Sequence, residues 1–306
     1  MNGNATQPNS GAPLTASDVL DGIDLTGRTA VVTGGYSGIG LATTRALAHA
    51  GARVVVPARR PDAAQQALAS ATGVELVTVD LADLASVRAF AQWFLDTHDA
   101  LDILIANAGI MACPETRVGP GWEAQFATNH LGHYALTNLL WPALTQAPTA
   151  RVVSVASGRT PAWRIRWDDV HFERGYDKWE AYAQSKLANI LFARHLDVLG
   201  RGHGVQAFSV NPGWILTPLQ RHLELDEMVA AGWIDTDGTA RPGLFRSVEQ
   251  GAATQVWAAT SRQLDGAGGD CYTDRRIVEG DAADGTEAAR LWTLSAELTG
   301  LDTPDA

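Results

Sequence analysis

The feature of this 306-residue chain that most constrains its fold is a glycine-rich turn between two very different runs of residues. Residues 29–33 are mostly β-branched, residues 34–40 include four glycines, and residues 39–50 are rich in alanine and leucine. The first run is typical of a strand buried on both faces, and the last is typical of a helix. A strand that turns directly into a helix begins a βαβ unit, which requires a parallel sheet.

The same alternation of strand-like and helix-like runs continues along most of the chain. Further strands are expected at residues 53–56, 75–79, 103–106, 151–155 and 205–210, and further helices at residues 62–71, 87–97, 129–144 and 182–199. We therefore predict an α/β fold with a Rossmann-type, doubly wound parallel sheet, in a single domain over residues 21–306. The start of the chain is rich in Asn, Gly and Pro, which predicts a disordered tail over residues 1–20.

Two long segments interrupt the alternation. Residues 158–181 and 213–246 are irregular and rich in aromatic residues. Loops of this length inside a compact domain are usually lids or binding loops. We predict that both are substrate loops.

Charge and composition exclude several classes of function. The formal net charge is −11, whereas a nucleic-acid partner normally needs a basic face. No run of about eighteen apolar residues occurs, and the first residues lack the pattern of a secretory signal. Cys113 and Cys271 have no CxxC context, which favours a reducing compartment. We therefore predict a soluble, cytoplasmic protein with neither a nucleic-acid nor a membrane partner.

The glycine-rich turn is itself a candidate dinucleotide site. Glycines there let backbone N–H groups approach a pyrophosphate, which would lie at the positive N-terminus of the following helix. The alternative is a tight strand–helix turn with no ligand. The expected contacts from this turn are Gly34, Tyr36, Ser37, Gly38, Ile39 and Gly40.

The end of the second strand should determine which cofactor is preferred. An acidic residue there would bind the ribose 2′-hydroxyl of NAD, whereas an arginine accommodates the 2′-phosphate of NADP. The chain has Arg59 and Arg60 at this point and no acid before Asp62. We predict NADP rather than NAD, the alternative being two solvated charges ahead of a helix.

Two more segments fit the same cleft, because ligands of parallel sheets bind at the carboxyl ends of strands. Asp80 and Leu81 follow the third strand, where a carboxylate can accept a hydrogen bond from an adenine amino group. Asn107, Ala108 and Gly109 end the fourth strand, where small residues let a ribose lie against the backbone. Each segment alone would be read as ordinary turn chemistry.

A helical Tyr/Lys pair supplies candidate proton-transfer chemistry. Tyr182 and Lys186 are four positions apart and so share one helix face. A phenol has a pKa near 10, and an adjacent ammonium is expected to lower it. Such pairs also occur by chance on many helices. Here Ser157 follows the fifth strand and Asn129 begins the preceding long helix.

Taken in order, these motifs resemble the short-chain dehydrogenase/reductase superfamily in its ordinary, non-extended form. Residues 128–134, residues 182–189 and the pair Leu291-Trp292 resemble the branch of the retinol dehydrogenases and the WW-domain oxidoreductase. The resemblance covers about residues 25–300. Members bound to membranes carry an apolar N-terminal anchor, and this chain starts with polar residues, so retinoid specificity does not carry over.

The resemblance implies a role for each candidate residue. Tyr182 would be the general acid/base, and Lys186 would lower its pKa and hold the nicotinamide ribose. Ser157 would orient the substrate carbonyl, and Asn129 would anchor a water in a proton relay. Further contacts to the nicotinamide would come from Pro212, Gly213 and Thr217.

The resemblance also implies the reaction, the interconversion of a carbonyl and an alcohol of a small molecule with NADP(H). Two alternatives are a non-catalytic dinucleotide-binding regulator and a nucleotide-sugar epimerase or dehydratase. No metal site is expected, because His130 and His133 have no third ligand and belong to the family motif. The sequence leaves a homo-oligomer open.

Tryptophans are unusually frequent in and beside the two irregular segments. They either pack the loops or an oligomer interface, or line a pocket for a bulky apolar carbonyl. They are Trp163, Trp167, Trp179, Trp214 and Trp233.

Overall fold

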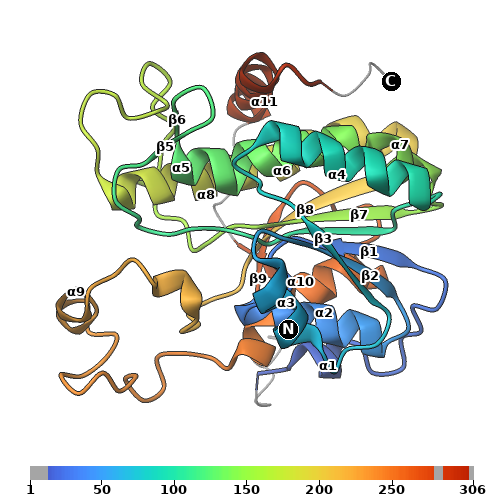
Figure 1. The fold of residues 1–306 in the computed structure, drawn as a ribbon, viewed down its shortest axis with the longest axis horizontal. Coiled ribbons are helices and arrows are strands. Elements are labelled where there is room, and N and C mark those ends of the chain that lie inside the picture. The colour runs from blue at the N-terminus through green and yellow to red at the C-terminus, as the bar shows by residue number, and fades with distance from the viewer. Residues whose placement is uncertain (1–12, 279–284, 303–306) are drawn as a thin grey trace, which may run out of the picture.

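A sheet of seven parallel strands, extended by one short antiparallel strand, runs through the middle of the molecule (Figure 1). The computed structural model describes residues 13–278 and 285–302. The strand order is β10-β9-β8-β7-β4-β1-β2-β3. The strands are β1 (Thr29–Val32), β2 (Arg53–Ala58), β3 (Val74–Thr78), β4 (Ile103–Ala106), β7 (Ala150–Val155), β8 (Val205–Asn211), β9 (Cys271–Thr273) and β10 (Arg276–Ile277).

The order of the strands creates a switch point between β1 and β4. From β1 the chain proceeds outward through β2 and β3, then returns to the other side of β1 at β4. The connections leaving β1 and β4 therefore run to opposite sides, which leaves a crevice at the carboxyl ends of the two strands. The glycine-rich turn and residues 107–109 lie at this point.

Helices cover both faces of the sheet (Figure 1). On one face lie α4 (Leu84–Thr97), α6 (Gly132–Leu139), α7 (Trp141–Gln146), α8 (Lys178–Gly200) and α11 (Gly285–Thr299). On the other lie α1 (Ala16–Val19), α2 (Gly38–His49), α3 (Pro61–Leu68) and α10 (Val248–Thr260). A separate hairpin of β5 (Arg117–Val118) and β6 (Trp122–Glu123) precedes the short helix α5 (Ala124–Phe126).

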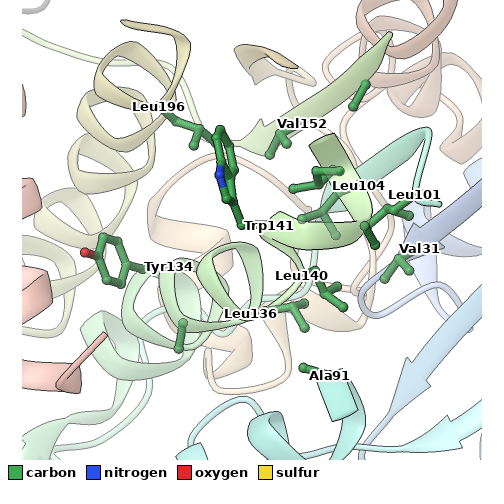
Figure 2. Close-up of a cluster of buried hydrophobic side chains, with 14 of the residues drawn as sticks. Val31, Ala91, Leu101, Leu104, Tyr134, Leu136, Leu140, Trp141, Val152 and Leu196 are labelled. Carbon is green, nitrogen blue, oxygen red and sulfur yellow. The ribbon is translucent and has the colours of Figure 1, made fainter. Parts of the chain in front are cut away.

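Each face has its own apolar core. Alternate residues of β1 point to opposite faces, so that Val31 joins one core while Ala30 and Val32 join the other. Figure 2 shows the first core, where side chains from α6 and α8, including Leu136 and Leu196, lie over the strands. The predicted Rossmann-type single-domain fold is confirmed.

The predicted helix over residues 129–144 was wrong in detail. Helical structure begins at α5, continues as a π-helical turn η1 (Ala127–Leu131) and α6, and is interrupted at Leu140 before α7. Pro142 accounts for the interruption, because proline has no N–H to donate and its ring crowds the preceding turn. Helix α8 begins at Lys178, four residues before the predicted start at Tyr182. The Asp177 side chain caps it there by accepting hydrogen bonds from the backbone N–H groups of Trp179 and Glu180.

The predicted tail was too long. Residues 13–20 include α1, whose first turn is held by reciprocal hydrogen bonds between Thr15 and Asp18. Ala16 and Leu20 are buried in the same apolar core as α10. Residues 1–12 lie outside the described residues.

The two irregular segments differ in how much regular structure they contain. Residues 158–177 form neither helix nor strand, and the last four residues of the predicted first loop belong to α8. The second segment contains a 3₁₀ turn, η3 (Pro218–Gln220), and the short helix α9 (Leu225–Ala230). In Figure 1 the part that contains α9 stands away from the body of the sheet.

Candidate active site

The glycine-rich turn packs directly against the end of β4. The Thr33 hydroxyl oxygen accepts hydrogen bonds from the backbone N–H groups of Asn107 and Ala108, each at 2.9 Å. Gly34 has φ +63°, and a Cβ there would lie 3.1 Å from the Ala108 Cα. A side chain at Gly34 would therefore push the two segments apart. Gly40 is not part of the site surface, because its Cα hydrogens face the Gly34 carbonyl at the base of the turn.

Tyr182 and Lys186 lie side by side on one face of α8, almost fully buried. Ser157 hydrogen-bonds to the Tyr182 phenol. The Lys186 ammonium donates to the Val155 carbonyl at 2.9 Å and lies 5.8 Å from the centre of the Tyr182 ring. The three side chains converge where β7 ends, at the floor of one pocket.

Burial dominates the ionisation of this pair. It raises the pKa of Tyr182 to about 12, and the hydrogen bond from Ser157 opposes the rise. It also lowers the pKa of Lys186 to about 8. Burial and the hydrogen bond with Ser157 account for the pKa of Tyr182 in this structure, and the expected lowering of that pKa by Lys186 stays a prediction.

Asn129 lies behind the site rather than in it. Its side chain is fully buried, donates to the Ile110 carbonyl and the Ser185 hydroxyl, each at 2.9 Å, and accepts from the Ile110 N–H at 2.8 Å. Ser185 in turn donates to the Tyr182 carbonyl. Asn129 thus connects the π-helical turn to both the backbone at Ile110, just after Gly109, and the helix that carries Tyr182.

One pocket of about 540 Å³ brings these features together. Of the predicted site residues, Gly40 and Asn129 do not line it. Those that do are Gly34, Tyr36, Ser37, Gly38, Ile39, Arg59, Arg60, Asp80, Leu81, Asn107, Ala108, Gly109, Ser157, Tyr182, Lys186, Pro212, Gly213 and Thr217.

The pocket has the form that an extended dinucleotide needs. It runs from Arg59 at the end of β2, past the glycine-rich turn, to Tyr182. Gly38 and Gly109 both line it where neighbouring side chains leave little room: a Cβ at Gly38 would lie 3.3 Å from Thr217, and one at Gly109 would lie 3.1 Å from the Asn129 amide oxygen behind the pocket. The residues present therefore fit a dinucleotide laid across the switch point.

Comparison with known proteins agrees with this geometry. The family model for short chain dehydrogenase matches residues 28–228. The chain belongs to the short-chain dehydrogenase family. It is an oxidoreductase of that family, and its relatives cover nearly the whole chain.

Among these relatives, a "Probable oxidoreductase" from Streptomyces lividans is 44% identical over 299 residues, covering 90% of this chain and 98% of the relative. Retinol dehydrogenase 12 from Mus musculus is 37% identical over 287 residues, covering 91% of this chain and 88% of that protein. The predicted resemblance is thereby confirmed.

Solved structures give the same result for the fold. One from Mycobacterium paratuberculosis has a TM-score of 0.75 and 35% identity, covering 96% of this chain and 100% of that chain. The RhlG/NADP active-site complex from Pseudomonas aeruginosa has a TM-score of 0.60 and 27% identity, covering 81% of this chain and 94% of that chain.

Aromatic side chains form one wall of the pocket in this short-chain dehydrogenase. Trp233 lies edge-on to Trp214, with ring centres 5.4 Å apart, and to Trp179, at 6.2 Å. Phe245 lies beside Trp214 at 6.4 Å. Trp163 also lines the pocket, whereas Trp167 does not and instead packs under Arg290, whose guanidinium carbon is 4.2 Å from its ring centre.

Sequence reasoning missed several lining residues of this short-chain dehydrogenase. Met111 and Leu219 line the pocket and form an apolar cluster with Tyr182, which Leu223 joins from outside the pocket. Arg221 lines the pocket close to Arg59 and Arg60. Nothing in the local sequence pattern distinguishes Arg221 from a surface arginine, because its position depends on how η3 folds back over the glycine-rich turn.

The two histidines of the family motif are buried in the short-chain dehydrogenase, and both form hydrogen bonds there. His130 hydrogen-bonds to the Ser295 hydroxyl at 2.7 Å. His133 donates through Nδ1 to the Asn129 carbonyl at 2.9 Å, and its Nε2 lies 2.8 Å from the Thr33 hydroxyl. Within residues 13–278 and 285–302, no three His, Cys, Asp or Glu side chains are placed to hold a metal ion. In the same residues, no helix is long and apolar enough to cross a membrane.

Proposed function

We propose that this protein is an NADP(H)-dependent oxidoreductase that interconverts a carbonyl and an alcohol, with Tyr182 as the general acid/base. The observation that carries the proposal is the convergence of Tyr182, Ser157 and Lys186 at one end of a pocket whose other end is the glycine-rich turn and the arginines after β2. When bound, the nicotinamide would supply or accept the hydride.

The environment of Tyr182 keeps its phenol in the protonated form. A phenol with a pKa of about 12 stays protonated near neutral pH, so the resting site holds a proton ready for a carbonyl oxygen. Ser157, which hydrogen-bonds to the same phenol, is placed to hold that oxygen from a second side. The carbonyl carbon would then face the hydride donor as its oxygen receives the proton.

Lys186 supports this chemistry from behind the phenol. Its ammonium already donates to the Val155 carbonyl and retains further N–H donors, because an ammonium group has three. We infer that these hold ribose hydroxyls of the cofactor. Asn129 would act one layer further back, through Ser185 and the backbone next to Gly109.

The pocket walls favour a bulky apolar substrate. Trp163, Trp179, Trp214 and Trp233 line the same pocket as Tyr182, and ligand pockets of this kind hold apolar bodies with few polar anchors. Retinol dehydrogenase 12 of Mus musculus acts, by its name, on a substrate of this class.

The cytoplasmic location and a homo-oligomer remain predictions.

Support for NADP comes from the arginines. Arg59 and Arg60 both line the pocket, and a guanidinium can bind a phosphate through two parallel charge-assisted hydrogen bonds. The RhlG structure from Pseudomonas aeruginosa was solved with NADP. A hydrogen bond to a charged group contributes about 1.5–3 kcal/mol, and each 1.4 kcal/mol or so is a factor of ten. We therefore expect kcat/KM to be higher with NADPH than with NADH by about one to two powers of ten.

A panel of aliphatic, aryl and polycyclic ketones, read by the absorbance of NADPH and of NADH, tests the proposal. We expect turnover of at least the aryl ketones with NADPH, and weaker turnover with NADH. Tight NADPH binding without turnover of any carbonyl or alcohol would instead favour a non-catalytic dinucleotide-binding regulator.

A further inference from the structure

Three arginines from two distant parts of the chain line the same pocket. Arg59 and Arg60 follow β2, whereas Arg221 directly follows η3 in the segment 213–246. In the part of the chain that the structure describes, no carboxylate forms an ion pair with any of the three. Asp80 also lines this pocket, but one of its carboxylate oxygens accepts from the Ala82 N–H.

The three charges lie close enough to affect one another. Partial burial lowers the pKa of Arg221, and the positive charges of Arg59 and Arg60 lower it further. His222, beside it, is affected in the same way, first by burial and then by Arg221 and Arg59. Like charges held together cost free energy unless an anion lies between them. In a chain with a net charge of −11, such a cluster indicates an anionic ligand.

The turn that carries Arg221 is firmly held. Thr217 and Gln220 form reciprocal hydrogen bonds around η3, and the Gln220 amide donates to the Ile215 carbonyl at 3.0 Å. Thr217 packs against Gly38, which places η3 directly over the glycine-rich turn. Arg221 therefore follows a turn held by its own hydrogen bonds, and its exposed side chain, which donates to the Pro218 carbonyl at 3.0 Å, lines the pocket.

The same turn also reaches the catalytic end of the pocket. Leu219 and Leu223 lie on either side of Arg221 in sequence, and both belong to the apolar cluster that includes Tyr182. Trp233, from the aromatic wall, joins that cluster. Whatever fixes Arg221 therefore also fixes one side of the substrate pocket.

We propose that Arg221 is the third guanidinium of a site for the 2′-phosphate of NADP(H), and that this contact holds segment 213–246 against Tyr182. The inference rests on the proposed NADP(H)-dependent function. It makes Arg221 both a determinant of cofactor preference and the link by which a bound cofactor completes the substrate pocket.

Calorimetric binding of two nucleotide fragments tests the phosphate contact. Adenosine 2′,5′-bisphosphate carries the 2′-phosphate, and adenosine 5′-monophosphate does not. Arg221→Met should weaken the bisphosphate at least about tenfold, as expected for one charge-assisted contact, and leave the monophosphate unchanged. Arg241→Met is the matched control, because Arg241 lies on the same segment outside the pocket and should affect neither ligand.

The outcomes separate the inference from the proposed function. If wild-type protein binds the bisphosphate no better than the monophosphate, the preference for NADP fails and the inference fails with it. If wild type prefers the bisphosphate and Arg221→Met keeps that preference in full, the inference alone is overturned. An equal loss of both ligands would also overturn it, because Arg221 would then not act on the 2′-phosphate.

Limited chymotrypsin digestion tests the link to the substrate wall. Trp214 is 53% exposed at the start of the segment, so we expect chymotrypsin to cleave after it, and mass spectrometry of the fragments identifies that cut. Saturating adenosine 2′,5′-bisphosphate should protect this site in wild type, and Arg221→Met at the same occupancy should lose the protection. Equal protection in both proteins would overturn the link.

Discussion

At the scale of single residues, one physical cause shapes the whole site. Burial stabilises the neutral forms of both Tyr182 and Lys186, and it therefore moves their pKa values in opposite directions, to about 12 and about 8. The identities of both residues were predictable from their spacing and motif. Their ionisation was not, because it depends on how much solvent the surrounding chain removes.

Replacing Tyr182 by Phe should remove the proton donor and little else. We expect turnover to fall by about 10² to 10⁴, the usual contribution of general acid–base catalysis, with NADPH affinity nearly unchanged. Tyr176→Phe is a matched control, because its hydroxyl binds the Cys113 carbonyl outside the pocket. Retention of most activity by Tyr182→Phe would contradict the assignment.

The lowered pKa of Lys186 leads us to predict a loss of activity at high pH. Its pKa lies below the usual 10.5, at about 8, so the ammonium loses its charge as the pH rises through 8. We expect kcat/KM for NADPH, which reports the free enzyme, to be constant below pH 8 and to fall above it. A profile that stays flat to pH 9.5 would show that the charge on Lys186 does not contribute.

At the scale of elements, the π-helical turn η1 is what the sequence failed to predict. The motif around Asn129 suggested an ordinary helix, and no pattern of apolar residues distinguishes a π turn from an α turn. Within the fold, tertiary contacts decide the conformation. Asn129 bonds to the backbone of Ile110, while His133 bridges the Asn129 carbonyl and Thr33.

The buried histidines of this region should make stability depend on pH. Burial lowers the pKa of His133 to about 4 and that of His130 to about 3, from 6.5. The contribution of these two histidines to the free energy of unfolding is therefore fully present above about pH 6.5. It is lost as the pH drops toward 4, because the unfolded chain binds protons that the folded chain does not. Each histidine contributes a slope of about 1.4 kcal/mol per pH unit near pH 5.5.

Urea unfolding measured from pH 7 to pH 5 checks this slope. Imidazole NMR signals that stay in their neutral position at pH 5 would assign it to the two buried rings. A free energy of unfolding that does not change between pH 6.5 and 5.5 would show that these rings are not held neutral.

The aromatic wall predicts how substrate size affects activity. Trp233→Ala should lower kcat/KM for polycyclic ketones by at least about tenfold, the effect of losing one or two methylene-sized contacts, and should affect small ketones less. Trp167→Ala is the control, because Trp167 lies outside the pocket. If both variants lose the same factor on every substrate, the tryptophans of the wall are packing residues.

At the scale of the whole molecule, the architecture was predictable and its last third was less so. Strands β1, β2, β4, β7 and β8 are largely apolar runs that alternate with helices, which predicts a parallel sheet. By contrast, β9 has only three residues, too few to show a clear pattern. The capping box of Ser247 and Gln250 at the start of α10 is a local signal for this helix that the sequence prediction did not use. Arg221 reaches the cofactor end only through the path of segment 213–246, which local patterns do not encode.

The central claim is that this pocket transfers a hydride between NADP(H) and a carbonyl carbon. The most direct measurement uses NADPH carrying deuterium at the transferable position of its nicotinamide, with mass spectrometry of the alcohol formed from an aryl ketone. We predict that one deuterium appears on the carbinol carbon with wild-type protein, and that Tyr182→Phe slows its appearance by at least about 10². An alcohol without deuterium, or no alcohol from any ketone despite NADPH binding, would contradict the account.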